Sequence, residues 1–348
     1  MRACSKKLTQ HLIVAQLLDD EQVQQAVDQL ADEVVLAHLK ADFLTALAKK
    51  GETPGEIAAF VRALRDKSIV PPLDAETRSR EILDIVGTGG DRLGTINIST
   101  TAALICAAAG VTVAKHGNRA VTSQAGSADV LEALGININL SPEAAAQSLR
   151  DHNFTFFFAP NYHPTFKHIS PARKLLAERG QRTIFNLLGP LLNPARPSAM
   201  LMGVPRPELC EPLAHVLQSL GIRRAMVVCG KVSDAGFLDE LSTLGENTIA
   251  EFYQERGFTT STTMPDQFPL QPASLADLIG GDKNANAKIV RSILSGQERG
   301  PKRDAVLLNA AAALFIAGKT KSQSEGWDLA GEVIDDGRAS AKLAELTS

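Results

Sequence analysis

Apolar residues in the first 66 positions of the chain recur at roughly helical spacing. The clearest run consists of Val23, Val27, Leu30, Val34 and Leu36. Such a run predicts an amphipathic helix that turns one apolar face towards a core. A small all-helical unit is therefore expected at the start of the chain.

Residues that end and begin helices divide this unit further. The apolar run over 41–47 leads to Gly51, a helix-ending residue, and Pro54 opens a further helix over 56–64. Two consecutive prolines at 71–72 then mark a linker. The helical unit is expected to end there.

The period of the pattern changes after the linker. Short apolar runs typical of strands occupy 82–86, 111–114, 154–158, 200–204 and 225–228. Helical patterns occupy 99–109, 208–220 and 305–316, and the last is apolar enough to be buried. Strands that alternate with helices indicate a parallel sheet. The predicted fold class is α/β with a smaller all-helical domain and a central, mostly parallel sheet flanked by helices. The polar, proline-containing stretch 255–272 is expected to be a surface excursion.

Bulk composition narrows the functional class. The 348 residues carry a formal net charge of −3, which does not favour binding to nucleic acid or to an anionic membrane. No apolar run approaches the roughly 18 to 20 residues of a membrane span. The short apolar stretch 11–18 runs into acidic residues, unlike a signal peptide. Four scattered cysteines without a CxxC pair predict a reduced, cytoplasmic protein.

The first candidate site follows the strand over 82–86. There the sequence Gly-Thr-Gly-Gly-Asp occupies 87–91, and glycines at a strand end let backbone N–H groups approach an anion. A helix is expected to start at 97–100, where Ser99 or Thr100 is a candidate cap and the helix dipole suits a phosphate. An ordinary tight turn followed by an ordinary helix cap explains this segment equally well.

A second candidate site follows the strand over 111–114. The segment Lys-His-Gly-Asn-Arg occupies 115–119, and Lys115 and Arg119 add positive charge to it. A further helix start with a serine cap is expected at 126–129. Because the carboxyl ends of parallel strands meet at one sheet edge, the two segments predict a ligand with two separated phosphate groups. A lone histidine such as His116 is more often structural, but its neighbours here favour ligand contact.

Two further clusters carry candidate chemistry. Asp239 and Glu240 form a carboxylate pair suited to Mg²⁺, although a solvated acidic turn is the commoner explanation of such a pair. His163 and Arg173 lie in a basic stretch, and an arginine there is suited to bind a carboxylate at two points. Surface polarity is an equally good explanation of His163 and His168.

Together these blocks resemble the anthranilate phosphoribosyltransferase family. The resemblance rests on segments that occur in the family's order, namely 41–53, 87–91, 97–100, 113–119, 126–135, 182–194, 239–242, 280–282 and 303–311. It spans most of the chain, and its joint specificity is high although each piece alone is weak or moderate. It implies a fold of the nucleoside phosphorylase and phosphoribosyltransferase type.

The resemblance also implies a reaction and its ligands. The family transfers the phosphoribosyl group of phosphoribosyl pyrophosphate (PRPP) to the amino group of anthranilate in tryptophan biosynthesis, with Mg²⁺. The expected catalytic help is positioning and charge neutralisation, from Lys115 and His116 among others, and no general base is assigned because an aryl amine needs no deprotonation before it attacks.

Carried over by motif, the expected site has three parts. The PRPP-binding residues are Gly87, Gly90, Asp91, Thr95, Asn97, Ile98, Ser99, Thr100, Lys115, His116, Gly117, Asn118, Ser123 and Ser127. The anthranilate-binding residues are Gly87, Asn118, His163 and Arg173. The metal contacts are Ser99, Asp239 and Glu240.

The implied organisation is two domains and a homodimer formed through the helical parts. The helical domain is expected over 1–75, joined by part of 165–190, and the α/β catalytic domain over 76–164 and 191–348. The chain departs from the family's pattern at Arg92, where glycine is common, at 122–123, at Phe166, and in a longer segment over 231–237.

Two other functions compete with this hypothesis. Pyrimidine nucleoside phosphorylases share the fold, but the carboxylate pair and the block 182–194 argue against them. A non-enzymatic, nucleic-acid-binding relative is expected to lose the glycine and lysine segments and to become basic, and this chain does neither.

Overall fold

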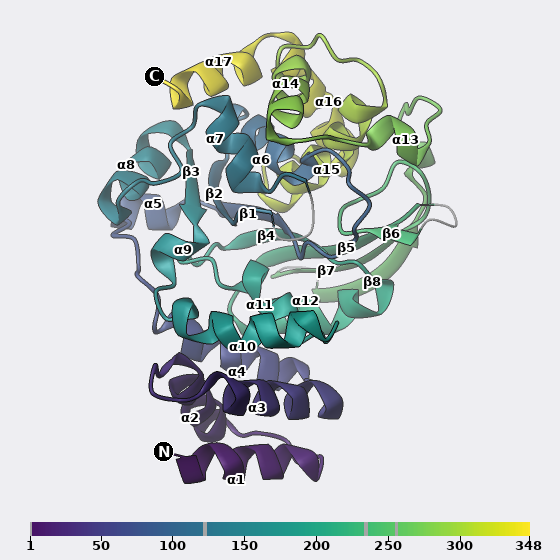
Figure 1. The fold of residues 1–348 in the computed structure, drawn as a ribbon. Coiled ribbons are helices and arrows are strands. Elements are labelled where there is room, and N and C mark those ends of the chain that lie inside the picture. The colour runs from purple at the N-terminus through teal and green to yellow at the C-terminus, as the bar shows by residue number, and fades with distance from the viewer. Residues whose placement is uncertain (1, 121–123, 233–235, 255–256) are drawn as a thin grey trace.

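A computed structural model describes residues 2–120, 124–232, 236–254 and 257–348 of the chain. Its helical unit packs below a twisted sheet that carries helices on both faces (Figure 1). This arrangement confirms the predicted fold class of an α/β protein with a smaller helical unit. Among the described residues, no helix is both long and apolar enough to cross a membrane.

The helical unit is built from helices with well-defined ends. Its first four helices are α1 (Arg2–Ile13), α2 (Asp20–Ala31), α3 (Ala37–Lys50) and α4 (Pro54–Arg65). Asp19 and Gln22 form a reciprocal capping box at the start of α2, and Thr53 and Glu56 form another at the start of α4. Gly51 ends α3 with a φ of 85°, as its position in the sequence predicts.

One sequence prediction in this unit is wrong. The apolar run was expected to continue one helix through Val34 and Leu36, but α2 ends at Ala31. The side chains of Val34 and Leu36 are 70% and 47% exposed, so they do not extend the buried face of the helix. Asp32 interrupts the helix, because its carboxylate accepts a hydrogen bond from the Val34 N–H at 2.9 Å and forms a local turn.

A later part of the chain packs against these helices. α10 (Phe166–Glu178) and α11 (Phe185–Leu191) contribute Ile169, Leu176 and Leu188 to the core of the helical unit. Hydrogen bonds join the two segments: the Lys40 Nζ donates to the His168 carbonyl at 2.8 Å, and the Arg65 Nε donates to the Leu191 carbonyl at 2.9 Å.

The described part of the sheet has eight strands in the order β3-β2-β1-β4-β5-β7-β8, with β6 paired to β5. The strands are β1 (Ile82–Gly87), β2 (Thr112–Gly117), β3 (Phe154–Phe158), β4 (Ala199–Gly203), β5 (Arg224–Val232), β6 (Gly236–Leu238), β7 (Asn247–Tyr253) and β8 (Gly257–Thr263). The pairs from β3 to β5 are parallel, and those that involve β6, β7 and β8 are antiparallel. The mostly parallel sheet is thus confirmed.

β8 corrects a second expectation. The stretch 255–272 was predicted to be a surface excursion, but 257–263 pairs along the whole of β7 and forms an edge of the sheet. Its polar residues mislead because an edge strand exposes one face to water, and threonine has a high strand propensity.

Alternating side chains of the strands face two different cores. Leu83, Ile85 and Val113 join a core above the sheet, with α6 (Ile98–Ala108) and α15 (Pro301–Ile316). Met200 and Met202 join the core below it, which is continuous with the helical unit. The helix predicted over 305–316 is confirmed as buried. Sheet and helical unit therefore share one packed interface.

The remaining helices complete these layers (Figure 1). They are α5 (Ala75–Ser79), α7 (Ser127–Leu134), α8 (Pro142–His152), α9 (Ala159–Tyr162), α12 (Cys210–Ser219), α13 (Leu275–Leu278), α14 (Lys283–Leu294), α16 (Gln323–Asp335) and α17 (Arg338–Leu346), with 3-10 turns at Pro207–Leu209 and Pro265–Gln267. The crossover helix expected from Glu208 thus begins as a 3-10 turn and becomes α-helical only at Cys210.

Candidate functional site

The carboxyl ends of β1 and β2 meet at one edge of the sheet, as parallel pairing requires. Both strands are longer than the sequence predicts: Gly87 is the last residue of β1, and Lys115, His116 and Gly117 lie within β2. The second segment is therefore mostly strand and not loop. Its backbone is fixed by the sheet, so the two glycine-containing segments have rigid starting points.

The acidic segment at 239–240 packs directly against the first glycine segment. The Gly89 N–H donates to Asp239 Oδ2 at 2.5 Å, across 150 residues of sequence. A Cβ at Gly87 would lie 2.6 Å from the same oxygen, and one at Gly203 would overlap the Asp239 carbonyl. Both positions require glycine because the acidic segment approaches the strand ends so closely.

The N-terminus of α6 meets the same segment. The Ser99 N–H donates to Glu240 Oε1 at 3.2 Å, so one free N–H group of the helix start is directed at a carboxylate. α6 begins at Ile98 with Asn97 at its cap, and neither Ser99 nor Thr100 caps it. The side chains of Ile98 and Thr100 are buried. The two predicted parts, glycine loop and carboxylate pair, are therefore one cluster.

Charges in this cluster are strongly perturbed. Burial raises the pKa of Asp239 well above its usual range, and repulsion from Asp91 and Glu240 raises it further. Burial likewise raises the pKa of Glu240 to about 7, although Lys115 acts in the opposite direction. Three carboxyl groups thus crowd together with one lysine near them. A cation bound between them would relieve this repulsion.

The donor set fits Mg²⁺ but makes no complete metal cage. No group of three or more His, Cys, Asp or Glu residues with metal-binding geometry occurs in the part of the chain that the structure describes. Mg²⁺ is commonly held by one or two carboxylates together with substrate phosphates and water. The carboxylates of Asp239, which is buried, and Glu240, which is half-buried, match the protein's share of such a site in number and chemistry.

Lys115 and His116 project to opposite faces of β2, as consecutive strand residues do. The Lys115 ammonium donates to the Ile85 carbonyl at 2.5 Å, and burial lowers its pKa. The His116 N–H donates to Asp84 Oδ1 at 3.3 Å. The strand therefore places a cation on the side of Glu240 and an imidazole on the side of the helical unit.

The turn that follows β2 is closely packed. A Cβ at Gly117 would collide with Ser127 Oγ, so this position also requires glycine. The Asn118 carbonyl accepts a hydrogen bond from the Ala128 N–H at 3.3 Å. The expected serine cap of α7 is not formed: Gly126 occupies the cap position, and its N–H donates to Asp129 Oδ2 at 2.9 Å. Ser123 lies outside the described residues.

Arg119 differs from its expected role. Its guanidinium pairs with Asp129 at 2.9 Å and with Glu132 at 3.0 Å. Its charge is therefore paired with carboxylates of the protein, and Arg119 is not the free cation that the sequence suggested.

A chain of aromatic rings and basic groups lies on the helical side of β2. The His116 and His163 rings meet edge to face at 5.3 Å between centroids, and the His163 and Phe166 rings lie 5.5 Å apart. Phe166 contacts Phe185 at 5.6 Å, and the Arg173 guanidinium lies 5.4 Å from the Phe185 ring. His163 and Arg173 are thus linked through two phenylalanines, a geometry suited to a flat aromatic ligand with a carboxylate.

The imidazoles of His116 and His163 are both buried, and each leaves its Nε2 without a partner among the described residues. Burial lowers the pKa of His116, with help from His163, and lowers the pKa of His163 to about 4. Both rings are therefore neutral at pH 7. Each can orient a polar ligand without adding charge.

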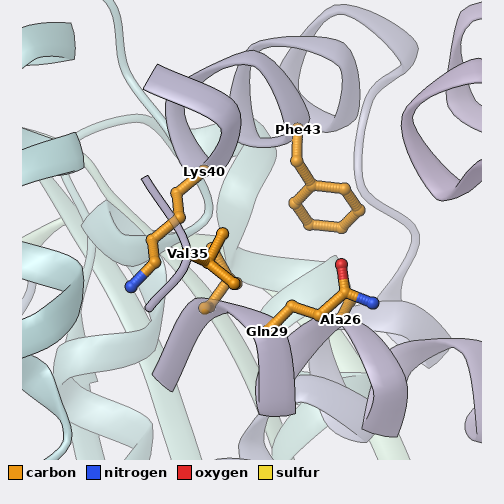
Figure 2. A pocket seen from close by; sticks show the side chains of 6 residues that line it. Ala26, Gln29, Val35, Lys40 and Phe43 are labelled. Carbon is orange, nitrogen blue, oxygen red and sulfur yellow. The ribbon is translucent and has the colours of Figure 1, made fainter. Parts of the chain in front are cut away.

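A small pocket elsewhere in the molecule is a poor candidate. It lies between α2 and α3, lined by Ala26, Gln29, Leu30, Val35, Lys40 and Phe43 (Figure 2). The Lys40 ammonium is engaged by the Asp32 carbonyl at 2.7 Å and by the His168 carbonyl. A mostly apolar lining, in which the Lys40 ammonium already donates to two carbonyls, does not suit a phosphorylated ligand.

Comparison with known proteins agrees with this geometry. The family profile described as "Glycosyl transferase family, a/b domain" matches residues 79–340, and "Glycosyl transferase family, helical bundle domain" matches residues 6–68. The anthranilate phosphoribosyltransferase of Lacticaseibacillus casei is 44% identical over 341 residues, which cover 98% of this chain and 96% of that protein.

Solved structures give the same result. The anthranilate phosphoribosyltransferase of Thermus thermophilus superposes with a TM-score of 0.88 at 42% identity and covers 98% of both chains. The Saccharomyces cerevisiae enzyme in complex with PRPP and Mg superposes with a TM-score of 0.87 at 28% identity, over 100% of this chain and 97% of that chain. This chain belongs to the anthranilate phosphoribosyltransferase family. The resemblance inferred from sequence is thereby confirmed.

Several residues that support this phosphoribosyltransferase site were not predicted. The Asn193 amide donates to Asp84 Oδ2 and to the Ala114 carbonyl, each at 2.7 Å, and so joins β1 to β2 beneath His116. Asn309 accepts a hydrogen bond from the Leu241 N–H at 3.0 Å and donates back to the Leu241 carbonyl at 2.9 Å. Both asparagines lie in segments that carried the resemblance, so their position was marked although their role was not.

A third asparagine secures the loop after β1. The Asn286 amide donates to Asn97 Oδ1 at 2.9 Å, and its own carbonyl accepts the Gly281 N–H at 2.8 Å. Thr95 forms an isolated bridge with Ile279 in the same region. The segment at 279–286 therefore holds the start of α6 in place. Nothing in the local sequence around Asn286 distinguishes it from an ordinary polar helix residue.

Proposed function

We propose that this chain, as an anthranilate phosphoribosyltransferase of tryptophan biosynthesis, transfers the phosphoribosyl group of PRPP to the amino group of anthranilate. The amine nitrogen forms a bond to C1 of the ribose while the bond from C1 to the pyrophosphate oxygen breaks. The nitrogen then releases one proton to solvent, and the products are N-(5-phosphoribosyl)anthranilate and pyrophosphate. The observation that carries the proposal is the contact of Asp239 and Glu240 with the glycine segment and with the start of α6.

PRPP is proposed to bind along the carboxyl ends of β1 and β2. The proposed contacts are those expected from the sequence, namely Gly87, Gly90, Asp91, Thr95, Asn97 to Thr100, Lys115 to Asn118, Ser123 and Ser127. Because Ile98 and Thr100 are buried, their contribution is through backbone N–H groups at the helix start. Lys115 lies near Glu240 and is suited to neutralise charge on a phosphate group.

Mg²⁺ is proposed to be held by Asp239 and Glu240, with Ser99 beside them. A relative from Saccharomyces cerevisiae was solved in complex with PRPP and Mg, which supports this assignment. When bound, the ion neutralises charge that develops on the leaving pyrophosphate. The protein's own part is to hold the two carboxylates in place through the Gly89 and Ser99 N–H groups.

Anthranilate is proposed to bind on the helical side of β2, between the two histidines and Arg173. Its ring would stack among His163, Phe166 and Phe185, and its carboxylate would face the Arg173 guanidinium. Gly87 and Asn118 complete the proposed contacts. A complex of the Saccharomyces cerevisiae enzyme with 4-fluoroanthranilate supports the ligand class. Lys115 and His116 are consecutive and project to opposite faces of β2. The acceptor, on the His116 face, would therefore approach the sugar from the face opposite Lys115.

Arg173→Ala tests the acceptor site. We expect kcat/KM for anthranilate to fall about 30-fold, the loss of one charge-assisted contact, while the KM for PRPP changes less than about twofold. The variant should also lose the preference for anthranilate over aniline, which lacks the carboxylate. Lys174→Ala is the matched control, since Lys174 is the exposed cation next along α10. Equal weakening of both substrates would refute the carboxylate role.

A homodimer formed through the helical unit is also proposed. Ile13, Val14 and Leu17 are 58 to 63% exposed, and Val34 and Leu36 are exposed on the same unit. Exposed apolar side chains gathered on one unit favour an interface between copies of the chain. Sedimentation equilibrium of the purified protein tests this, and a monomer at micromolar concentration would contradict it.

A cytoplasmic location is proposed from the cysteines. Cys106, Cys210 and Cys229 are buried free thiols, as is usual in a reducing compartment.

A further inference from the structure

The loop that follows β1 is fixed at both ends but carries an exposed arginine at its centre. On one side the Gly89 N–H binds Asp239, and on the other the Gly94 carbonyl accepts a hydrogen bond from the Gly280 N–H at 2.9 Å. Arg92 lies between these anchors and is exposed. The backbone on either side of Arg92 is therefore anchored, to Asp239 through Gly89 and to Gly280 through Gly94.

The backbone of Arg92 has an unfavourable conformation for an L-residue. Its φ is 59°, in the left-handed region that glycine adopts readily. A side chain there is disfavoured, because its Cβ lies too close to the backbone carbonyl oxygen. Gly89 and Gly94 of the same loop have φ of 70° and 69° at no such cost. The loop geometry thus suits glycine at position 92, and the sequence has an arginine instead.

The charge of Arg92 has no partner in the part of the chain that the structure describes. Among the described residues it forms no hydrogen bond and no ion pair. The other cations at this sheet edge are engaged: Lys115 donates to the Ile85 carbonyl, and Arg119 pairs with Asp129 and Glu132. Asp91, which precedes Arg92, accepts a hydrogen bond from the Leu93 N–H and raises the pKa of both Asp239 and Glu240.

A guanidinium without a partner among the described residues, on the loop whose Gly89 N–H donates to Asp239, is suited to a polyanion that arrives with its metal ion. Guanidinium groups bind phosphate oxygens through paired N–H donors. We propose that Arg92 is a further substrate-binding residue, which contacts the pyrophosphate group of PRPP and increases its rate of capture. This inference rests on the proposed function and extends it to a position outside the expected site residues.

Three substitutions separate the charge of Arg92 from its backbone conformation. Arg92→Gly removes both the charge and the strain, Arg92→Asn removes the charge with a residue that tolerates the left-handed region, and Arg92→Lys keeps the charge. We expect KM for PRPP to rise about tenfold in the glycine and asparagine variants, with the KM for anthranilate within about twofold of the wild type. The lysine variant should recover most of the difference.

Salt dependence and direct binding provide two independent measurements. The KM of the wild type for PRPP should rise with ionic strength more steeply than that of Arg92→Asn, because screening acts on the removed charge. Titration calorimetry with pyrophosphate and Mg²⁺ should show the same loss of affinity without any turnover. Lys49→Gln, which removes an exposed charge from α3, is the control and should match the wild type.

The outcomes distinguish this inference from the proposed function. A normally active wild type whose KM for PRPP and pyrophosphate affinity are unchanged in Arg92→Asn overturns the inference alone. An equal change in both substrates, or in Tm and both substrates together, also overturns it. A wild type that neither binds nor turns over PRPP overturns both proposals.

Discussion

Two buried carboxylate sites, one in the helical unit and one at the sheet edge, have opposite electrostatics. In the helical unit, Glu56 is 3% exposed and pairs with the Lys50 ammonium at 2.7 Å. It also accepts hydrogen bonds from the Leu18 N–H and the Thr53 N–H, each at 3.0 Å. These partners outweigh the effect of burial, so the pKa of Glu56 is lowered.

At the sheet edge, Asp239 and Glu240 are supported by one backbone N–H each and repel one another. Their pKa values are raised. Buried or half-buried carboxylates are thus satisfied by the protein in one region and left short of positive charge in the other. The difference favours the sheet-edge site as the proposed ligand and metal site, because a shortage of counter-charge is a usual feature of such sites.

The largest expected effect is the loss of activity when either carboxylate at the sheet edge is neutralised. We expect Asp239→Asn and Glu240→Gln each to lower kcat/KM by about 10²- to 10³-fold, because charge neutralisation on the leaving group is lost. Tm should stay equal or rise, because the substitution removes one of several repelling charges. Steady-state kinetics at saturating Mg²⁺ and a thermal melt measure the two effects. A large drop in Tm would place these residues with Glu56 as structural.

The second prediction concerns Glu56 itself. Glu56→Gln should lower the free energy of unfolding by about 3 kcal/mol, because it leaves the buried Lys50 ammonium without its counter-charge. The kcat of the folded fraction should not change, since Glu56 lies in the helical unit. Urea denaturation measures the stability.

An exposed ion pair supplies the control for that measurement. Arg62 and Asp20 lie 3.4 Å apart with side chains 47% and 83% exposed, so Asp20→Asn should change stability by less than about 0.5 kcal/mol. Equal effects at Glu56 and Asp20 would contradict the distinction between the two kinds of ion pair.

The same contrast explains what the sequence could reveal. The parallel strands β1 to β5 and the buried helix over 305–316 were predicted, because apolar periodicity reports burial directly, whereas β6, β7 and β8 were not. Gly51 and Pro54 also marked a helix end and a helix start correctly. Glycines at 87 and 117 were identified as special because few residues tolerate such close approach.

Features that depend on long-range contacts were not predictable. Arg119 looked like a free cation until its partners Asp129 and Glu132 were placed beside it. The side chains of Asn193, Asn286 and Asn309 form hydrogen bonds with groups that lie 68 to 189 residues away in the sequence. Polar side chains that act through such distant groups have no periodic signal. The individual ligand contacts, including Ser123, stay predictions for the same reason.

The smallest expected effect is on pH dependence, and it comes from Asp84. This carboxyl group is fully buried, and burial raises its pKa to about 6 against the opposing effects of Lys115 and Asn193. A raised pKa means that the folded state binds the proton more tightly than the unfolded state. The stability from this group is therefore fully present below about pH 4 and is lost as the pH rises through about 6. Glu56 has the opposite sign, because its lowered pKa supplies stability above about pH 4.5 that is lost as the pH falls.

Asp84→Asn should therefore weaken the pH dependence of the free energy of unfolding, but only at the higher end of the pH range. Between about pH 5 and pH 7 the wild type should lose about 1 kcal/mol more than the variant, since the amide side chain of the variant does not titrate. Below about pH 4 both should fall alike, because Glu56 is intact in each. Denaturation curves across this range, taken as the difference between the two proteins, isolate Asp84 from other titrating groups. Parallel profiles over the upper part of the range would show that Asp84 is paired as well as Glu56 is, and the contrast between the two regions would then hold only for Asp239 and Glu240.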